Sequence, residues 1–299
     1  MTHVATLISN PARPTVVTAL VDAVRAELPG AGKPQWLAQN IAADIPFALP
    51  PGTSDRAMAD RLRGQFPDGI DVVVQPAAGR RKALFLADMD STMIGQECID
   101  ELADFVHLKP HVAAITERAM RGEIAFEPAL RERVALLKGL PETVIDEVIR
   151  DRIRLTPGAR ILVMTMRAYG TYTCLVSGGF KAFTDRIAAV IGFHENRSNT
   201  LEVGQDGKLA GLVREPIFGR DAKLQTLLDL RQQRGIAREA TLAAGDGAND
   251  LSMIQEAGLG VAYHAKPAVA EAAHARIDHG DLTALLYLQG YKREEFVEV

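Results

Sequence analysis

The stretch Ala83-Leu-Phe-Leu-Ala-Asp-Met-Asp-Ser-Thr92 joins an apolar run to two carboxylates, Asp88 and Asp90, that are separated by one residue. A short uninterrupted apolar run is typical of a strand that is buried on both faces of a parallel sheet. Side chains two positions apart in a strand point to the same side, so both acids can address one site. Because open α/β sheets bind ligands outside the carboxyl ends of their strands, we expect a functional site at this point.

Two carboxylates at this spacing repel each other unless a cation or a shared proton lies between them. A hard cation with oxygen and water ligands solves this problem, and Mg²⁺ suits it. An EF-hand loop is excluded, because Thr92 and Met93 occupy the fifth and sixth loop positions, where that loop needs an acid or Asn and then Gly. For this cluster alone, the acids of a solvated surface turn remain an alternative.

Two further clusters suit an anion. Ser177-Gly-Gly-Phe180 closes one expected strand and opens a helix, where a hydroxyl and glycine amides form an anion site. An ordinary turn explains this string equally well. Lys223 falls in the first turn of the next expected helix, where a cation is unfavourable unless it faces an anion. A single helical lysine is nevertheless more often solvated.

The fourth cluster is Ala244-Gly-Asp-Gly-Ala-Asn-Asp250, which joins a strand to a helix. Its glycines permit a tight turn, Asp246 can complete a metal site, and Asn249 and Asp250 suit a helix start. A plain turn with a helix cap is the alternative, which this specialised composition disfavours. Together the four clusters supply a nucleophile, a cation site and oxygen-binding donors, which is what phosphoryl transfer requires.

Other catalytic classes lack their motifs in this chain. No Gly-x-x-x-x-Gly-Lys-Ser/Thr loop is present, and no Gly-x-Gly-x-x-Gly follows the first strand of the expected sheet, which excludes P-loop and dinucleotide-binding sites. Neither Cys98 nor Cys174 has the spacing of a nucleophile motif, and they resemble small apolar core residues rather than a disulfide pair. The seven histidines fall outside all four clusters.

Length and composition favour a two-unit soluble enzyme. The chain has 299 residues, of which 47% are hydrophobic and 24% charged, with a net charge of −4. These values exclude general disorder, and no run approaches eighteen apolar residues, which argues against a transmembrane protein. The charges are mixed and aromatics are few, so we expect neither a nucleic-acid partner nor a membrane surface, and we expect a cytoplasmic location.

The order of expected elements predicts an α/β fold with a parallel sheet that has helices on both faces, an inserted helical cap and an N-terminal α+β domain of ferredoxin type. The domains are expected at 1–78 (N-terminal), 79–95 with 156–299 (catalytic core) and 96–155 (cap). The expected strands are 4–8, 36–41, 71–75, 83–87, 171–176, 241–244, 258–262 and one near 277, with a hairpin through 200–213. The expected helices are 15–28, 54–66, 160–169, 181–191, 220–234, 250–257 and 267–273, besides those of the cap.

The ordered quartet of motifs resembles that of haloacid dehalogenase-like phosphatases over about residues 83–290, and within them it is most similar to phosphoserine phosphatases. The strings that carry this resemblance are Asp88-x-Asp-Ser-Thr, Glu97-x-Ile-Asp, Phe126-Glu-x-x-Leu-Arg-x-Arg-Val, Ser177-Gly-Gly-Phe and Gly245-Asp-Gly-Ala-Asn-Asp. The family usually has an aromatic residue where Met89 stands, a change from which we expect little consequence.

The resemblance implies hydrolysis of O-phosphoserine through an aspartyl-phosphate, the last step of serine biosynthesis. Asp88 is implied as the nucleophile and Asp90 as the general acid and base. Lys223, Ser177 and the Gly178 amide are implied as phosphate-binding groups. The implied Mg²⁺ ligands are Asp88, the backbone carbonyl of Asp90, and Asp246, with Asp250 supporting them from behind.

The cap is implied to recognise the amino-acid part of the substrate. Arg133 matches the residue that binds the carboxylate and Glu97 the residue that faces the ammonium group, although a solvated arginine is the ordinary case in a charged helix. Further substrate contacts are implied at Met120, Phe126 and Asn249. The N-terminal domain resembles an ACT-like domain, which can bind amino acids; a packing module, or one that forms a homodimer, is at least as well supported.

Three alternatives remain open at this point. The phosphoryl group could pass to another hydroxyl, as in a phosphotransferase, or the substrate could be another small phosphomonoester. A catalytically idle amino-acid-binding regulator is a third option, but it does not need the complete set of four clusters.

Overall fold

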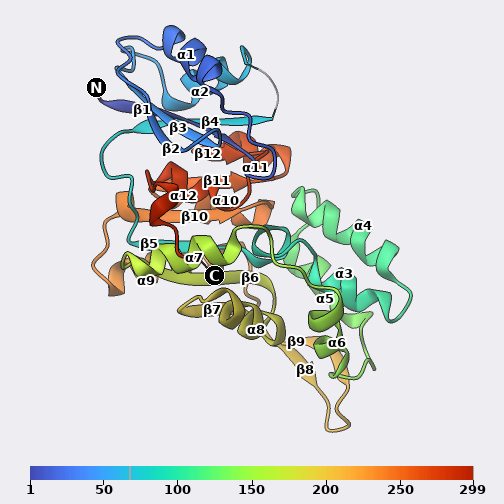
Figure 1. The fold of residues 1–299 in the computed structure, drawn as a ribbon. Helices are drawn as coiled ribbons and strands as arrows, with labels where there is room; N and C mark the ends of the chain where they lie inside the picture. The colour runs from blue at the N-terminus through green and yellow to red at the C-terminus, as the bar shows by residue number, and fades with distance from the viewer. Residues whose placement is uncertain (67–68, 299) are drawn as a thin grey trace.

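The computed structural model describes residues 1–66 and 69–298. Its main parts are a four-stranded antiparallel sheet, a six-stranded parallel sheet and a group of helices that projects to one side (Figure 1). Over the described residues, no helix is both long and apolar enough to cross a membrane.

The N-terminal sheet has the order β2-β3-β1-β4, with all neighbours antiparallel. Helices α1 and α2 cover one of its faces through a common apolar core. This β-α-β-β-α-β arrangement is the ferredoxin-like type that the sequence predicts. The bounds are β1 His3–Ser9, α1 Thr18–Glu27, β2 Gln35–Ala38, β3 Ala42–Phe47, α2 Asp55–Arg63 and β4 Ile70–Pro76.

The strand expected at 36–41 is wrong in its second half, and β3 was not anticipated. The chain turns at Asn40, which has a φ of 60°, and re-enters the sheet as β3. Pro46 normally argues against an interior strand because it cannot donate to the ladder. It is tolerated here because the register of β2 with β3 extends only from residue 42 to Asp44.

The parallel sheet has the order β12-β11-β10-β5-β6-β7, which confirms the expected α/β fold. Alternate residues of β5 face opposite layers: Leu84 and Leu86 pack with α9, α10 and α11, and Phe85 and Ala87 pack with α7, α8 and α12. The strands are β5 Leu84–Ala87, β6 Tyr172–Phe180, β7 Glu195–Asn199, β10 Thr241–Gly245, β11 Leu259–Tyr263 and β12 Ala275–Ile277. The helices are α7 Ala159–Ala168, α8 Lys181–Ile191, α9 Arg220–Gln233, α10 Leu251–Glu256, α11 Pro267–Ala272 and α12 Ala284–Leu288.

Two elements of this layer, β7 and α12, were missed by the sequence analysis. The edge strand β7 reads Glu-Asn-Arg-Ser-Asn and is only half-buried over most of its length, so it lacks the apolar pattern of the other strands. Helix α12 has five residues, all of them buried, and is too short to show helical periodicity.

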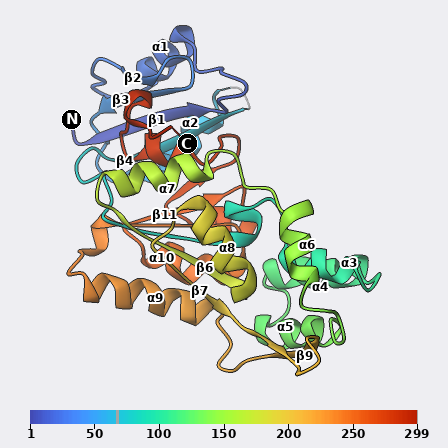
Figure 2. The same ribbon diagram turned by 60° about the horizontal axis from the view of Figure 1, so that its bottom comes forward.

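The projecting helices lie between β5 and β6 in the chain and form the expected helical insertion (Figure 2). They are α3 Cys98–Asp104, α4 Lys109–Met120, α5 Phe126–Ala135 and α6 Val144–Asp151. A hairpin of β8 Leu201–Val203 and β9 Leu209–Val213 reaches them from the core. The Gly139 amide donates to the Leu209 carbonyl at 2.9 Å, so the hairpin extends the insertion by backbone pairing. The domain boundaries themselves stay predictions.

The second face of the N-terminal sheet packs against α12, with Ile8 and Val73 in the same apolar cluster as Leu285. Arg80 lies at this contact. Its guanidinium pairs with the buried Asp44 and donates to the carbonyls of Tyr287 and Leu288 at 2.9 Å. The two sheets are therefore joined by apolar packing and by a largely buried ion pair.

Replacing Arg80 with Met is expected to lower the free energy of unfolding by about 3 kcal/mol, because it leaves the Asp44 carboxylate buried without a cation. The measurement is the midpoint of urea unfolding. Arg25→Met on the exposed side of α1 is the matched control, and an equal shift in both variants would contradict the importance of the Arg80 contact.

Candidate active site

Three neighbouring strands of the parallel sheet end at the same edge and bring the predicted acids together. Ala87 of β5 pairs with Ala244 of β10 on one side and with Leu175 of β6 on the other. Asp88 follows the end of β5 directly, and Asp246 follows the end of β10 directly. The meeting of these segments follows from the register of parallel strands.

Lys223 joins two of the acids. Its Nζ donates to Asp88 Oδ1 and to Asp250 Oδ1, both at 2.7 Å, and none of its side chain is exposed. Burial alone would lower the pKa of Lys223, but the carboxylates of Asp250 and Asp88 raise it above its ordinary value. The lysine is therefore a fixed cation, and the solvated alternative is wrong for it.

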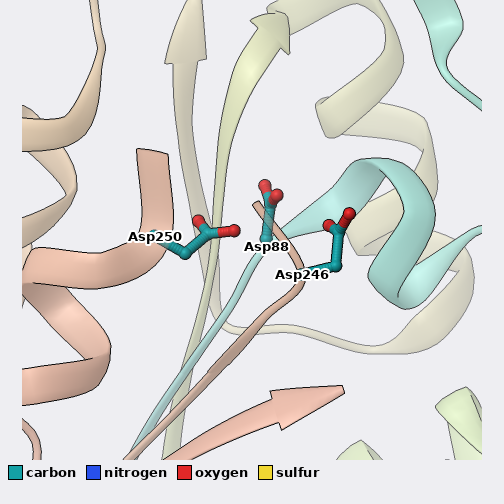
Figure 3. Close-up of side chains that lie close together, drawn as sticks. All are labelled: Asp88, Asp246 and Asp250. Atoms are coloured by element: carbon teal, nitrogen blue, oxygen red, sulfur yellow. The ribbon is translucent and has the colours of Figure 1, made fainter. Parts of the chain in front are cut away.

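Asp88, Asp246 and Asp250 form a compact acidic group (Figure 3). One oxygen from each lies within 4.8 Å of the other two, and all three residues are buried. Burial, followed by the charges of Asp88 and Asp250, raises the pKa of the Asp246 carboxyl well above its usual range. A site of hard oxygen ligands with an unfavourable excess of negative charge fits a divalent cation such as Mg²⁺.

The glycine before Asp246 permits the close approach of Asp250. A Cβ at Gly245 would lie 2.4 Å from the Asp250 carboxyl carbon, so any side chain there would displace it. Asp250 Oδ2 also accepts from the Gly247 amide at 3.1 Å. One Asp250 oxygen thus accepts from Lys223 and the other from the Gly247 amide, so both oxygens of this carboxylate are fixed in place.

Asp90, two residues after Asp88, contacts Ser177 of β6. Its Oδ1 accepts from the Cys98 amide at 3.0 Å, and its Oδ2 accepts from the Ser177 hydroxyl at 3.3 Å. Burial raises the pKa of the Asp90 carboxyl, against the effect of these hydrogen bonds. The Ser177 hydroxyl in turn accepts from the Gly179 amide at 2.8 Å.

The inserted helices contribute a buried cation. Arg133 on α5 is 2% exposed, and its Nε donates to the Ala129 carbonyl at 3.0 Å. Its Nη1 donates to the Thr116 hydroxyl at 2.9 Å. Within residues 1–66 and 69–298, no carboxylate oxygen lies within 4.0 Å of this guanidinium. Burying an arginine without an anionic partner costs free energy of folding, which indicates that a ligand supplies the anion.

Glu97 and Asn249 add two acceptors near Arg133. Glu97 accepts from the Ser91 hydroxyl at 2.6 Å, and burial, followed by the charge of Asp90, raises the pKa of its carboxyl well above the usual range. The Oδ1 atom of Asn249 is buried and has no donor among the residues that the structure describes. Both oxygens are suited to receive N–H groups of a ligand.

These residues surround one cavity. Its lining is Asp88, Asp90, Glu97, Ile99, Met120, Phe126, Leu130, Arg133, Gly178, Gly179, Phe180 and Asn249. Four of the predicted site residues lie outside this lining. Lys223 and Ser177 donate to Asp88 and Asp90 within it, and Asp250 accepts from Lys223. Asp246 has an oxygen within 4.8 Å of those of Asp88 and Asp250. Ile99 and Leu130 were missed, because apolar residues of a helix carry no functional signal in a sequence.

The inserted helices close over the cavity from the opposite side to the strand ends. A Cβ at Gly178 would lie 2.7 Å from Cζ of Phe126, so the aromatic ring needs a glycine beneath it. An ion pair also joins the insertion to the core, between Glu117 of α4 and Lys266 at 2.8 Å. The two free cysteines are both buried, and the backbone amide of Cys98 donates to Asp90.

A family model described as haloacid dehalogenase-like hydrolase matches residues 85–255 of this chain. A phosphoserine phosphatase of Polaromonas sp. is 51% identical over 210 residues, which are 69% of this chain and 89% of that protein. A phosphoserine phosphatase of Mycobacterium tuberculosis is 41% identical over 254 residues, which are 84% of this chain and 62% of that protein. The chain thus spans less than two thirds of the mycobacterial relative.

Solved structures with the same fold include one relative of similar length and one shorter relative. A haloacid dehalogenase-family hydrolase of Salmonella enterica serovar Typhi has a TM-score of 0.82 and 31% identity, and the match covers 96% of this chain and 97% of that one. A substrate-bound phosphoserine phosphatase has a TM-score of 0.66 and 39% identity, covering 69% of this chain and 98% of that one. The N-terminal sheet therefore has a counterpart in the first structure.

Replacing Lys223 with Met is expected to lower the free energy of unfolding by about 3–5 kcal/mol in metal-free buffer, because Asp88 and Asp250 lose their shared cation. Urea unfolding followed by circular dichroism measures the shift. Lys138→Met, at an exposed position on the inserted segment, is the control and should unfold like the wild type. Stability equal to the wild type in Lys223→Met would disprove the lysine's role as the internal cation.

Proposed function

We propose that this chain, which belongs to the haloacid dehalogenase-like hydrolase family, hydrolyses O-phosphoserine to serine and phosphate. The observation that carries the proposal is one cavity with Asp88 at the strand ends and the unpaired Arg133 in the inserted helices. Phosphoserine has a phosphate at one end and a carboxylate and an ammonium group at the other. The high identity to phosphoserine phosphatases supports the same substrate.

The amino-acid end of the substrate fits the inserted helices. Arg133 binds the carboxylate, since its planar guanidinium matches two carboxylate oxygens. Glu97 and the Asn249 Oδ1 atom face the ammonium group. Met120 and Phe126 enclose the short carbon chain and keep water out of the cavity.

In the first step, an Asp88 carboxylate oxygen attacks the phosphorus in line with the ester bond, and the bond from phosphorus to the serine oxygen breaks. Asp90, whose raised pKa favours the protonated form, gives its proton to the departing serine oxygen. Lys223 neutralises Asp88 and the transferring group, while Ser177 and the Gly178 amide bind phosphate oxygens.

In the second step, Asp90 takes a proton from water as the water oxygen attacks the phosphorus. The bond from phosphorus to Asp88 breaks, phosphate leaves, and Asp88 is regenerated. Asp90 thus acts as acid in one step and base in the other, which requires a pKa closer to neutrality than that of a free aspartate.

Mg²⁺ is the cation that the acidic group suits, and it would be held by Asp88, the Asp90 backbone carbonyl and Asp246, with Asp250 behind them. When bound, it would neutralise charge on the transferring phosphoryl group. Formation of a homodimer stays a prediction from the sequence.

The proposal is tested by phosphate release with Mg²⁺ from phosphoserine, phosphothreonine, phosphotyrosine, sugar phosphates and p-nitrophenyl phosphate. We expect strong preference for phosphoserine, and a loss of at least about 10³-fold in kcat for Asp88→Asn, because an amide is a poor nucleophile.

Asp22→Asn, at an exposed position on α1, is the control for that measurement and should keep full activity. Activity that Asp88→Asn abolishes but that favours another phosphomonoester would retain the chemistry and refute the substrate. Added homoserine distinguishes hydrolysis from transfer, since a phosphotransferase would form phosphohomoserine.

Removal of divalent cations by EDTA followed by dialysis is expected to abolish phosphate release, and Mg²⁺ is expected to restore it. Asp246→Asn should raise the Mg²⁺ concentration needed for half-maximal rate by about tenfold or more, because one anionic ligand is lost. Full activity of the dialysed enzyme would contradict the metal requirement.

A further inference from the structure

Arg133 is held in an unusual way for a buried cation. An arginine carries five N–H donors, of which this one uses two, on the Ala129 carbonyl and the Thr116 hydroxyl. The other three have no acceptor in the part of the chain that the structure describes. Since both partners are neutral, the guanidinium keeps its full positive charge for a ligand.

One acid of this arrangement, Asp100, is linked to Arg133 through the Thr116 hydroxyl. Thr116 on α4 donates to Asp100 Oδ1 at 2.7 Å and accepts from Arg133 Nη1 at 2.9 Å. Asp100, on α3, is 8% exposed, and Thr116 is 3% exposed. The path Asp100–Thr116–Arg133 therefore crosses three packed helices of the insertion without a direct ion pair.

A hydroxyl between the charges has a different effect from direct pairing. A carboxylate in bidentate contact would occupy the donors that a ligand carboxylate needs and would compete with it. Through the hydroxyl, Asp100 orients Arg133 and partly offsets its buried charge, yet leaves its outer N–H groups free. Asp100 also lies three residues after Glu97, which directly precedes α3. The residue proposed to face the ammonium group and the acid linked to Arg133 therefore fall within about one helical turn.

We infer that Thr116 and Asp100 are positioning residues that set the preference of the cavity for substrates with a carboxylate group. This inference rests on the proposed function, because it concerns how that same cavity selects its substrate. Thr116 orients the guanidinium plane, and Asp100 fixes the direction of the Thr116 hydroxyl.

The test compares phosphoserine with O-phosphoethanolamine, which has the same phosphate and ammonium groups but no carboxylate. Thr116→Val removes the hydroxyl and keeps the side-chain shape. It is expected to raise KM for phosphoserine about tenfold with little change in kcat, and to leave kcat/KM for phosphoethanolamine within twofold. The substrate ratio is kcat/KM for phosphoserine divided by kcat/KM for phosphoethanolamine. Thr116→Ser should keep this ratio at its wild-type value, and Asp100→Leu should lower it, as Thr116→Val does.

Thr226→Val is the matched control. Thr226 on α9 is also a buried helical threonine whose hydroxyl reaches the carbonyl four residues before it, at 2.8 Å, as Thr116 reaches Val112 at 3.0 Å. Thr226→Val is expected to leave the substrate ratio unchanged. In an Arg133→Met background, Thr116→Val should have no further effect on the ratio, because the group that it positions is gone.

Failure of this inference can be separated from failure of the proposed function. Two results would refute the positioning role while phosphoserine remains the substrate. One is an equal loss of kcat/KM for both substrates in Thr116→Val. The other is a further fall in the substrate ratio when Thr116→Val is added to Arg133→Met. If the wild type prefers another carboxylate-bearing phosphomonoester over its decarboxylated analogue, the same variants apply to that pair. No preference for a carboxylate in any pair would overturn both.

Discussion

The structure of the site depends on one electrostatic constraint: three buried carboxylates around a single buried ammonium group. Asp88, Asp246 and Asp250 are brought together by the ends of β5 and β10, and Lys223 is their one cation among the described residues. Such a group holds excess negative charge away from water, where repulsion is strong. A divalent cation bound by these acids would relieve this excess and make the field favourable for an anionic phosphate.

The inserted helices present the opposite electrostatic situation on the other side of the same cavity. Arg133 is buried and positive, and no carboxylate of the described residues is in contact with it. Burial raises the pKa of the Glu97 carboxyl, so its ionised form is costly without a cationic partner. A substrate that brings its own carboxylate and ammonium group satisfies both residues together. The insertion therefore contributes most of the groups that suit an amino-acid end, together with Asn249 of the core, and the strand ends contribute the acids that suit a cation.

Much of the site could be predicted from the sequence, because parallel strands end at one edge. Asp88, Asp246 and Ser177 each follow a recognisable strand, and Lys223 stood out since a helix start disfavours a cation. Arg133 could be identified only through its surrounding motif. Thr116 and Asp100 could not be predicted, because their contacts depend on how α3, α4 and α5 pack. For the same reason α12 was missed, since its helical form depends on burial against the N-terminal sheet rather than on its own five residues.

Two buried arginines of this molecule show how a structural cation differs from a functional one. Arg80 pairs directly with Asp44, and its remaining donors reach Thr6, Tyr287 and Leu288. Its charge is thus matched by a carboxylate in direct contact, which suits a permanent joint between two sheets. Arg133 is more deeply buried, yet it has only neutral partners and three free donors. A buried polar group left unsatisfied is costly, so its persistence is best explained by a ligand that supplies the missing acceptors. The same comparison shows the effect of placing a hydroxyl between Asp100 and Arg133: the outer N–H groups of Arg133 stay free.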